Sequence, residues 1–171
     1  MKQLDSGFRR VALQRLALIC ALLLTGTVPA LAGNPDFEGT WEIDLERSDP
    51  INPQGLKLDG SYTLTLDGEN LATTRTITAG GQSQDIDWTF VTDGKPHEIP
   101  GMRAPRKART KWKKNKLNVS YTISMDTPRG AFDLDIVETW SINKKGELEI
   151  LYATRLPNRT QTRREFYVRQ E

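Results

Sequence analysis

Apolar and polar residues alternate with a period of two along most of the chain after residue 38. The pattern is cleanest at residues 117–125, where five apolar residues alternate with Asn, Ser and Thr. Such alternation is typical of a β-strand that has one buried face and one solvated face. The three- and four-residue spacings of an amphipathic helix do not persist anywhere after residue 32. The sequence therefore predicts an all-β domain.

Short segments rich in Gly, Asn, Asp, Pro and Lys separate the alternating stretches, for example at residues 67–70 and 143–146. Joins this short favour antiparallel neighbours, because a parallel crossover needs a dozen or more residues. Residues 49–60 lack alternation and are expected to form a long loop, of the kind that often lies over an open end of a barrel. About nine strands are predicted, near residues 39–46, 61–66, 70–78, 84–91, 106–113, 116–125, 131–142, 147–156 and 161–169. An antiparallel up-and-down β-barrel of about eight or nine strands fits this meander, and a two-sheet β-sandwich is the alternative.

Residues 1–32 have the three parts of a secretory signal peptide. A basic start precedes a short apolar core at residues 16–24, and the segment ends in Ala30-Leu31-Ala32. The apolar core is too short to span a membrane as a helix. We therefore expect an exported domain of residues 33–171, in the periplasm or outside the cell, with no transmembrane span once the signal is cleaved. Its 20 basic and 21 acidic residues leave it nearly neutral, which argues against a globally basic nucleic-acid binder.

A Gly-x-Trp motif, Gly39-Thr40-Trp41, opens the first predicted strand. This motif in a small antiparallel barrel resembles the signature of the lipocalin/calycin superfamily, and residues 39–48, 93–96 and 138–142 resemble bacterial exported lipocalin-like domains. The resemblance implies that Gly39 lets the chain bend and that Trp41 plugs the closed end of the barrel. It also implies that an arginine near the last strand packs over Trp41. Arg164 is expected in that role, because it shares the parity of Phe166 and Val168, which we predict to point inward.

Aromatic residues occupy alternating positions in several predicted strands. They either fill the barrel or line an apolar pocket at its mouth, where small barrels hold ligands. The candidate ligand-binding residues are Trp88, Phe90, Trp112, Tyr121, Trp140 and Tyr152.

Residues 103–116 hold eight basic residues and no acidic residue. Their odd–even pattern predicts one basic face and one inward face formed by Ala108, Thr110 and Trp112. The basic face either pairs with acidic residues of neighbouring strands, such as Asp85, Asp87, Asp133 and Asp135, or binds an anionic partner. The basic patch comprises Arg103, Arg106, Lys107, Arg109, Lys111 and Lys113.

Catalytic and metal-binding motifs are absent from the sequence after residue 32. This segment has no cysteine, which excludes disulfides, thiol catalysis and Cys-based metal sites, and we expect no cofactor. His97, the only histidine, is expected in a surface turn. An enzyme would need a buried polar cluster, for instance around Arg75, Glu138 and Arg155. The favoured function is binding of a small apolar or amphipathic ligand in the barrel, and the alternative is an envelope interaction module that uses residues 103–116 on anionic partners.

Overall fold

The computed structural model describes residues 34–52, 54–101, 105–127, 130–156 and 158–171. The predicted signal peptide, residues 1–32, and Arg103 lie outside these ranges. No helix in the described part of the chain is long and apolar enough to cross a membrane.

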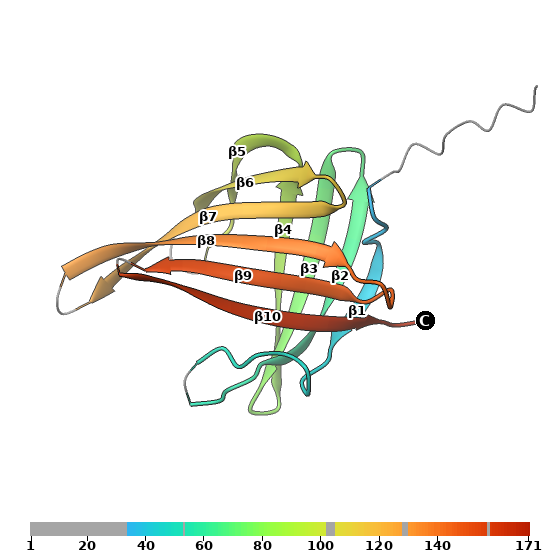
Figure 1. Ribbon diagram of the computed structural model, residues 1–171, viewed down its shortest axis with the longest axis horizontal. Coiled ribbons are helices and arrows are strands. Elements are labelled where there is room, and N and C mark those ends of the chain that lie inside the picture. The colour runs from blue at the N-terminus through green and yellow to red at the C-terminus, as the bar shows by residue number, and fades with distance from the viewer. Residues whose placement is uncertain (1–33, 53, 102–104, 128–129, 157) are drawn as a thin grey trace, which may run out of the picture. The chain divides into compact units, whose positions relative to one another are not determined.

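Ten antiparallel strands form a single sheet that curls into a nearly closed barrel (Figure 1). The order in the sheet is β4-β3-β2-β1-β10-β9-β8-β7-β6-β5. The nine predicted strands are all present, and the single sheet excludes the two-sheet sandwich. The strands are β1 (Gly39–Ile43), β2 (Asp59–Asp67), β3 (Asn70–Ala79), β4 (Gln82–Val91), β5 (Asp93–Ile99), β6 (Arg106–Lys113), β7 (Lys116–Thr127), β8 (Gly130–Ile142), β9 (Leu148–Leu156) and β10 (Arg159–Arg169).

Of the ten strands, β5 is the one that the sequence did not predict. The sequence around Gly94 and Pro96 indicated a turn, whereas the structure pairs this segment with β6 across an irregular register between Asp93 and Pro96. His97 therefore lies within a strand and not in a turn, and its Nε2 is 3.0 Å from Asp93 Oδ1. Pro96 is tolerated because β5 is an edge strand of the sheet.

The barrel closes without a hydrogen-bonded ladder between β4 and β5. At this seam the indole Nε1 of Trp88 on β4 donates to the carbonyl oxygen of Pro100, just after β5, at 3.1 Å. A side chain therefore bridges the two edge strands.

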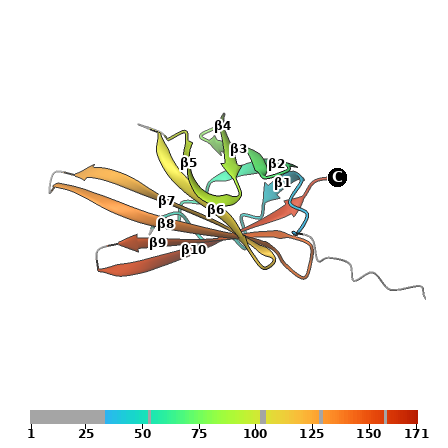
Figure 2. The ribbon, with the colours of Figure 1, turned by 90° about the horizontal axis from the view of Figure 1, so that it is seen from above.

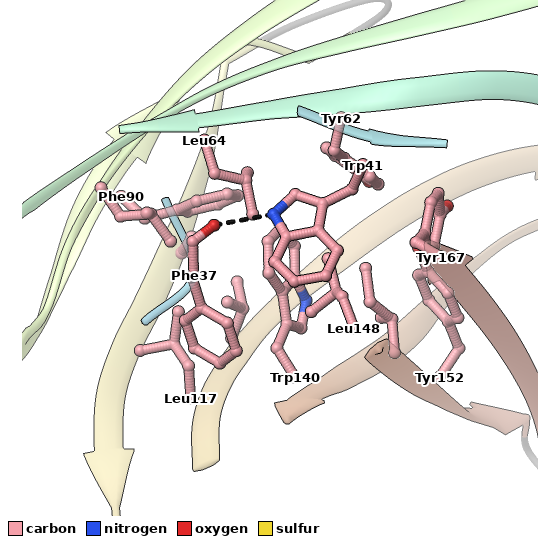
Figure 3. Close-up of a cluster of buried hydrophobic side chains, with 14 of the residues drawn as sticks. Phe37, Trp41, Tyr62, Leu64, Phe90, Leu117, Trp140, Leu148, Tyr152 and Tyr167 are labelled. Carbon is pink, nitrogen blue, oxygen red and sulfur yellow. Dashed lines mark hydrogen bonds between the residues drawn. The ribbon is translucent and has the colours of Figure 1, made fainter. Parts of the chain in front are cut away.

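The core fills the end of the barrel near β1 with aromatic and aliphatic side chains (Figure 3). Trp41 is fully buried, and its indole Nε1 donates to the carbonyl oxygen of Phe37 at 2.8 Å. Tyr62 packs against Trp140 and Tyr167, with both pairs of ring centroids 5.3 Å apart. Trp41 thus lies at the centre of a packed end of the barrel. This is the position that the resemblance of the Gly-x-Trp motif implies.

The inward face of the last strand differs from the prediction. Glu165 and Tyr167 are buried, whereas Val168 is exposed, so the expected parity of β10 is wrong. Arg164 consequently points outward and pairs with Glu149. The arginine over Trp41 is Arg169 and not Arg164: the Arg169 guanidinium lies 4.5 Å from the centroid of the Trp41 ring.

The β1–β2 loop follows the side of β10. The backbone N–H groups of Asp44 and Asp49 donate to the carbonyls of Phe166 and Arg164. Arg47 forms two hydrogen bonds with the Glu147 carboxylate, each 3.0 Å long. These bonds hold the loop against β10 and the β8–β9 turn.

Candidate ligand-binding site

A polar network lies on the inward face of β10 and shares Tyr152 and Tyr167 with the core. The Glu165 carboxylate contacts the guanidinium of Arg163 and lies 3.5 Å from that of Arg75 on β3. It also accepts hydrogen bonds from the hydroxyls of Tyr152, at 2.9 Å, and Tyr167, at 2.7 Å. Burial alone would raise the pKa of Glu165, but the two guanidinium groups outweigh burial, with help from the tyrosine hydroxyls, and lower the pKa below its usual range.

A second buried carboxylate belongs to Glu138 on β8. It accepts hydrogen bonds from the hydroxyl of Tyr121, at 2.6 Å, and from the indole Nε1 of Trp140, at 2.8 Å. Burial raises the pKa of Glu138 in spite of these two bonds. This carboxyl group therefore holds its proton more tightly than an exposed glutamate.

The guanidinium of Arg106 stacks over the ring of Tyr121, with its Cζ 4.8 Å from the ring centroid. Its Nε is buried and has no hydrogen-bond partner among the described residues. A buried donor without a partner costs free energy. Arg106 is therefore the inward cation that a ligand can still satisfy, whereas Arg75 and Arg163 are already paired with Glu165.

A hollow of about 1220 Å³ opens beside Arg106, near the ends of β6–β9. The β7–β8 hairpin projects past its neighbours at this end of the molecule (Figure 2). Adjacent residues of opposite parity, such as Thr122 and Ile123, both line the hollow, so it borders both faces of the projecting hairpin. Its apolar lining includes Ile123, Met125 and Ile136, and its charged lining includes Arg106, Lys107, Arg109, Arg155 and Asp135.

The six aromatic residues proposed as ligand contacts occupy two environments. Tyr121 lines the hollow. Phe90, Trp140 and Tyr152 are buried in the core, and Trp88 and Trp112 pack against it. Trp112 is further held by stacking on Phe37, with ring centroids 5.4 Å apart.

The polar cluster suggested by Arg75, Glu138 and Arg155 is present in part. Arg75 and Glu138 lie in the barrel interior, but Arg155 is exposed on the outward face of β9. Sequence reasoning missed Arg163 and Glu165, which complete the interior network. Arg163 and Glu165 alternate with the intervening residues in the same way as Tyr167. This pattern would have predicted that all three point inward, if charged residues had been allowed on an inward face.

The basic face of β6 matches its predicted parity. Ala108 and Thr110 are buried, while Lys107, Arg109, Lys111 and Lys113 are exposed. None of these four cations forms an ion pair in the part of the chain that the structure describes. The acidic residues proposed to neutralise them instead accept hydrogen bonds from cross-strand Thr and Ser hydroxyls, as Asp135 does from Thr122. The hypothesis of pairing between strands is therefore wrong for these acids.

The described residues contain no group of three or more His, Cys, Asp or Glu side chains that could hold a metal ion. The interior network consists of carboxylates, guanidinium groups and phenols that are paired with one another. The hollow therefore offers a ligand hydrogen-bonding and cationic groups beside apolar side chains.

No family model matches this chain, and no curated protein sequence matches it. Solved structures do match in fold. A protein titled "REP1-NXSQ fatty acid transporter" has a TM-score of 0.55, is 13% identical, and the match covers 80% of this chain and 97% of that one. A secretory abundant heat soluble protein from Ramazzottius varieornatus has a TM-score of 0.56 at 13% identity, covering 81% and 98%. Human cRBP IV has a TM-score of 0.53 at 13% identity, covering 80% and 99%. At this level of identity the comparisons establish a shared barrel fold.

Proposed function

We propose that this protein is an exported barrel that binds one small amphipathic molecule in the hollow at its projecting end. The observation that carries the proposal is the hollow itself, which combines apolar side chains with the unsatisfied Arg106. Ligand pockets typically measure about 300–1,000 Å³, so the hollow is large enough for a lipid-sized molecule. Burial of an alkyl chain against Ile123, Met125 and Ile136 would supply the affinity.

Arg106 determines how the proposed ligand is oriented in the hollow. A guanidinium with a buried, unpaired Nε favours a hydrogen-bond acceptor, and an anionic acceptor most strongly. The deeper guanidinium groups already share the Glu165 carboxylate, so an acidic ligand gains little there. The polar end of the ligand is therefore placed near Arg106, with its apolar part along the β7–β8 hairpin.

Two further considerations support the proposal. Matching barrels include one titled as a fatty acid transporter, which fits a ligand with an acidic end and an apolar chain. The signal-like residues 1–32 support export into the periplasm or the extracellular space. Cell fractionation with an N-terminal sequence of the mature protein tests this part, and retention of residues 1–32 on a cytoplasmic protein would contradict it.

Native mass spectrometry and competition with a fluorescent lipid test the ligand. We expect a long-chain acid to bind at one site, more tightly than the alcohol of equal length. Arg106→Gln should remove most of that preference, and Ile123→Gln should weaken both ligands about tenfold or more. Val168→Gln, at an exposed position that does not line the hollow, is the matched control. A folded protein that binds neither the long-chain acid nor the alcohol would reject the proposal.

A further inference from the structure

The outward face of β6 carries a row of cations, which we call the β6 basic row: Lys107, Arg109, Lys111 and Lys113. Successive members are two residues apart, which places their Cβ atoms about 7 Å from one another and spreads the row over about 20 Å. The alternate residues of the strand are anchored in the core, as Ala108 and Thr110 are. The row is therefore held on a rigid element.

The charges of the β6 basic row are not neutralised by ion pairs within the described structure. None of its four side chains takes part in an ion pair. Glu98 on β5 lies opposite Lys107 in the register, but both are exposed and form no bridge. Asp93, opposite Lys111, is engaged by the backbone N–H of Lys95 and by His97.

The rest of the domain has the opposite charge. Without the eight basic residues of 103–116, residues 33–171 hold 12 basic against 21 acidic residues. An anionic partner is therefore attracted by this row, whereas the net negative charge of the remaining residues opposes its binding elsewhere. This asymmetry favours an approach through β6 even though the domain as a whole is nearly neutral.

We propose that the β6 basic row docks the barrel on the surface of an anionic lipid bilayer. Four cations spaced along one strand can contact several anionic headgroups at once, each contributing to binding. The row presents no exposed aromatic ring, since Trp112 of the same strand packs against the core, so it lacks the stacking platform that single-stranded nucleic acids use. Lys107 and Arg109 also line the hollow, so docking brings the hollow close to the bilayer.

Vesicle co-sedimentation tests the proposal with the protein lacking residues 1–32, the form expected after export. Vesicles of phosphatidylcholine with about one third phosphatidylglycerol should bind the protein at low salt, and pure phosphatidylcholine vesicles should not. The double variant Lys111→Glu and Lys113→Glu should bind about thirtyfold more weakly or worse, and binding should fall steeply as salt rises. The control Lys144→Glu and Lys145→Glu, in the exposed β8–β9 turn, changes the net charge equally and should bind almost as the parent does.

Several outcomes would overturn the proposal. Equal losses for both double variants would mean that binding follows net charge and not the row. The protein could instead fail to bind vesicles and yet be retained on dextran sulfate, with the retention lost in the Lys111→Glu and Lys113→Glu variant. That result would assign the row to a soluble polyanion. Lys111 and Lys113 do not line the hollow, so lipid binding in solution should survive in that variant, and a failure of docking stays distinct from a failure of the ligand proposal.

Discussion

At the scale of single residues, Glu165 is the centre of the barrel interior. Its carboxylate compensates two guanidinium groups and accepts two tyrosine hydroxyls, all in a buried environment. Buried charges are tolerable when each has partners, and costly when one partner is removed. The protein thus supplies its own carboxylate at the position where its interior cations converge.

Replacement Glu165→Gln should destabilise the fold by about 3 kcal/mol, because the partly buried Arg75 and Arg163 would remain without a compensating charge. Urea unfolding at neutral pH measures this loss. Glu149→Gln is the matched control, since its ion pair with Arg164 is largely exposed and should contribute less than about 1 kcal/mol. Similar losses for both variants would contradict the central place of Glu165.

Glu138 should give stability a distinct pH dependence. Because burial raises its folded pKa above that of the unfolded chain, its contribution is fully present below the usual glutamate range and is lost as pH rises through the folded pKa. Glu138→Gln should therefore gain stability relative to the parent as pH rises from 4 towards 8. Each pH unit by which the two pKa values differ corresponds to about 1.4 kcal/mol. Unfolding curves across this pH range measure the difference, and a constant offset between the two proteins would refute the assignment. Glu165, whose folded pKa is lowered, acts oppositely and loses its contribution only in acid.

At the scale of strands, alternation located nine of the ten elements, because half-buried strands leave a period-two pattern. Two errors have physical causes. Strand β5 is an edge with an irregular register, so its Gly94 and Pro96 look like a turn. In β10 the inward face carries Arg163 and Glu165, and the rule that apolar residues point inward fails where the interior is polar. For the same reason Arg164 was predicted to lie over Trp41, where the structure places Arg169.

The start of β2 approaches β3 too closely for any side chain. Gly60 has a φ of 154°, and a Cβ there would lie 1.9 Å from the carbonyl oxygen of Thr76. Gly60→Ala should therefore force the two strands apart and destabilise the protein by about 2 kcal/mol or more. Gly68→Ala, in the β2–β3 turn, should cost only about 1–2 kcal/mol, because its φ is positive but the space around it is open. Thermal unfolding of both variants measures the contrast, and a smaller loss for Gly60→Ala would be evidence against the close approach.

At the scale of the whole molecule, the barrel has a closed, packed end and an open end. The core around Trp41 seals the first, while the β7–β8 hairpin and the hollow form the second. Sequence alone did not separate these ends, because inward aromatic residues look the same whether they pack together or face a ligand. Of the six candidates, Tyr121 alone belongs to the hollow lining, since it lies farther along β7 than the core residues Leu117 and Val119.

The seam between β4 and β5 should be the most labile part of the barrel wall. Backbone amides of these edge strands that face the seam lack ladder partners, so they should exchange with deuterium much faster than amides of β2 and β9, which are paired on both sides. Trp88→Phe removes the indole bond to the Pro100 carbonyl and should speed exchange further in β4 and β5 without a comparable effect on β9. Trp112→Phe, at a tryptophan of β6 that packs on Phe37, is the control. Hydrogen exchange followed by mass spectrometry resolves these segments. Uniform protection around the barrel would mean that β4 and β5 are joined more tightly than one side-chain bridge allows.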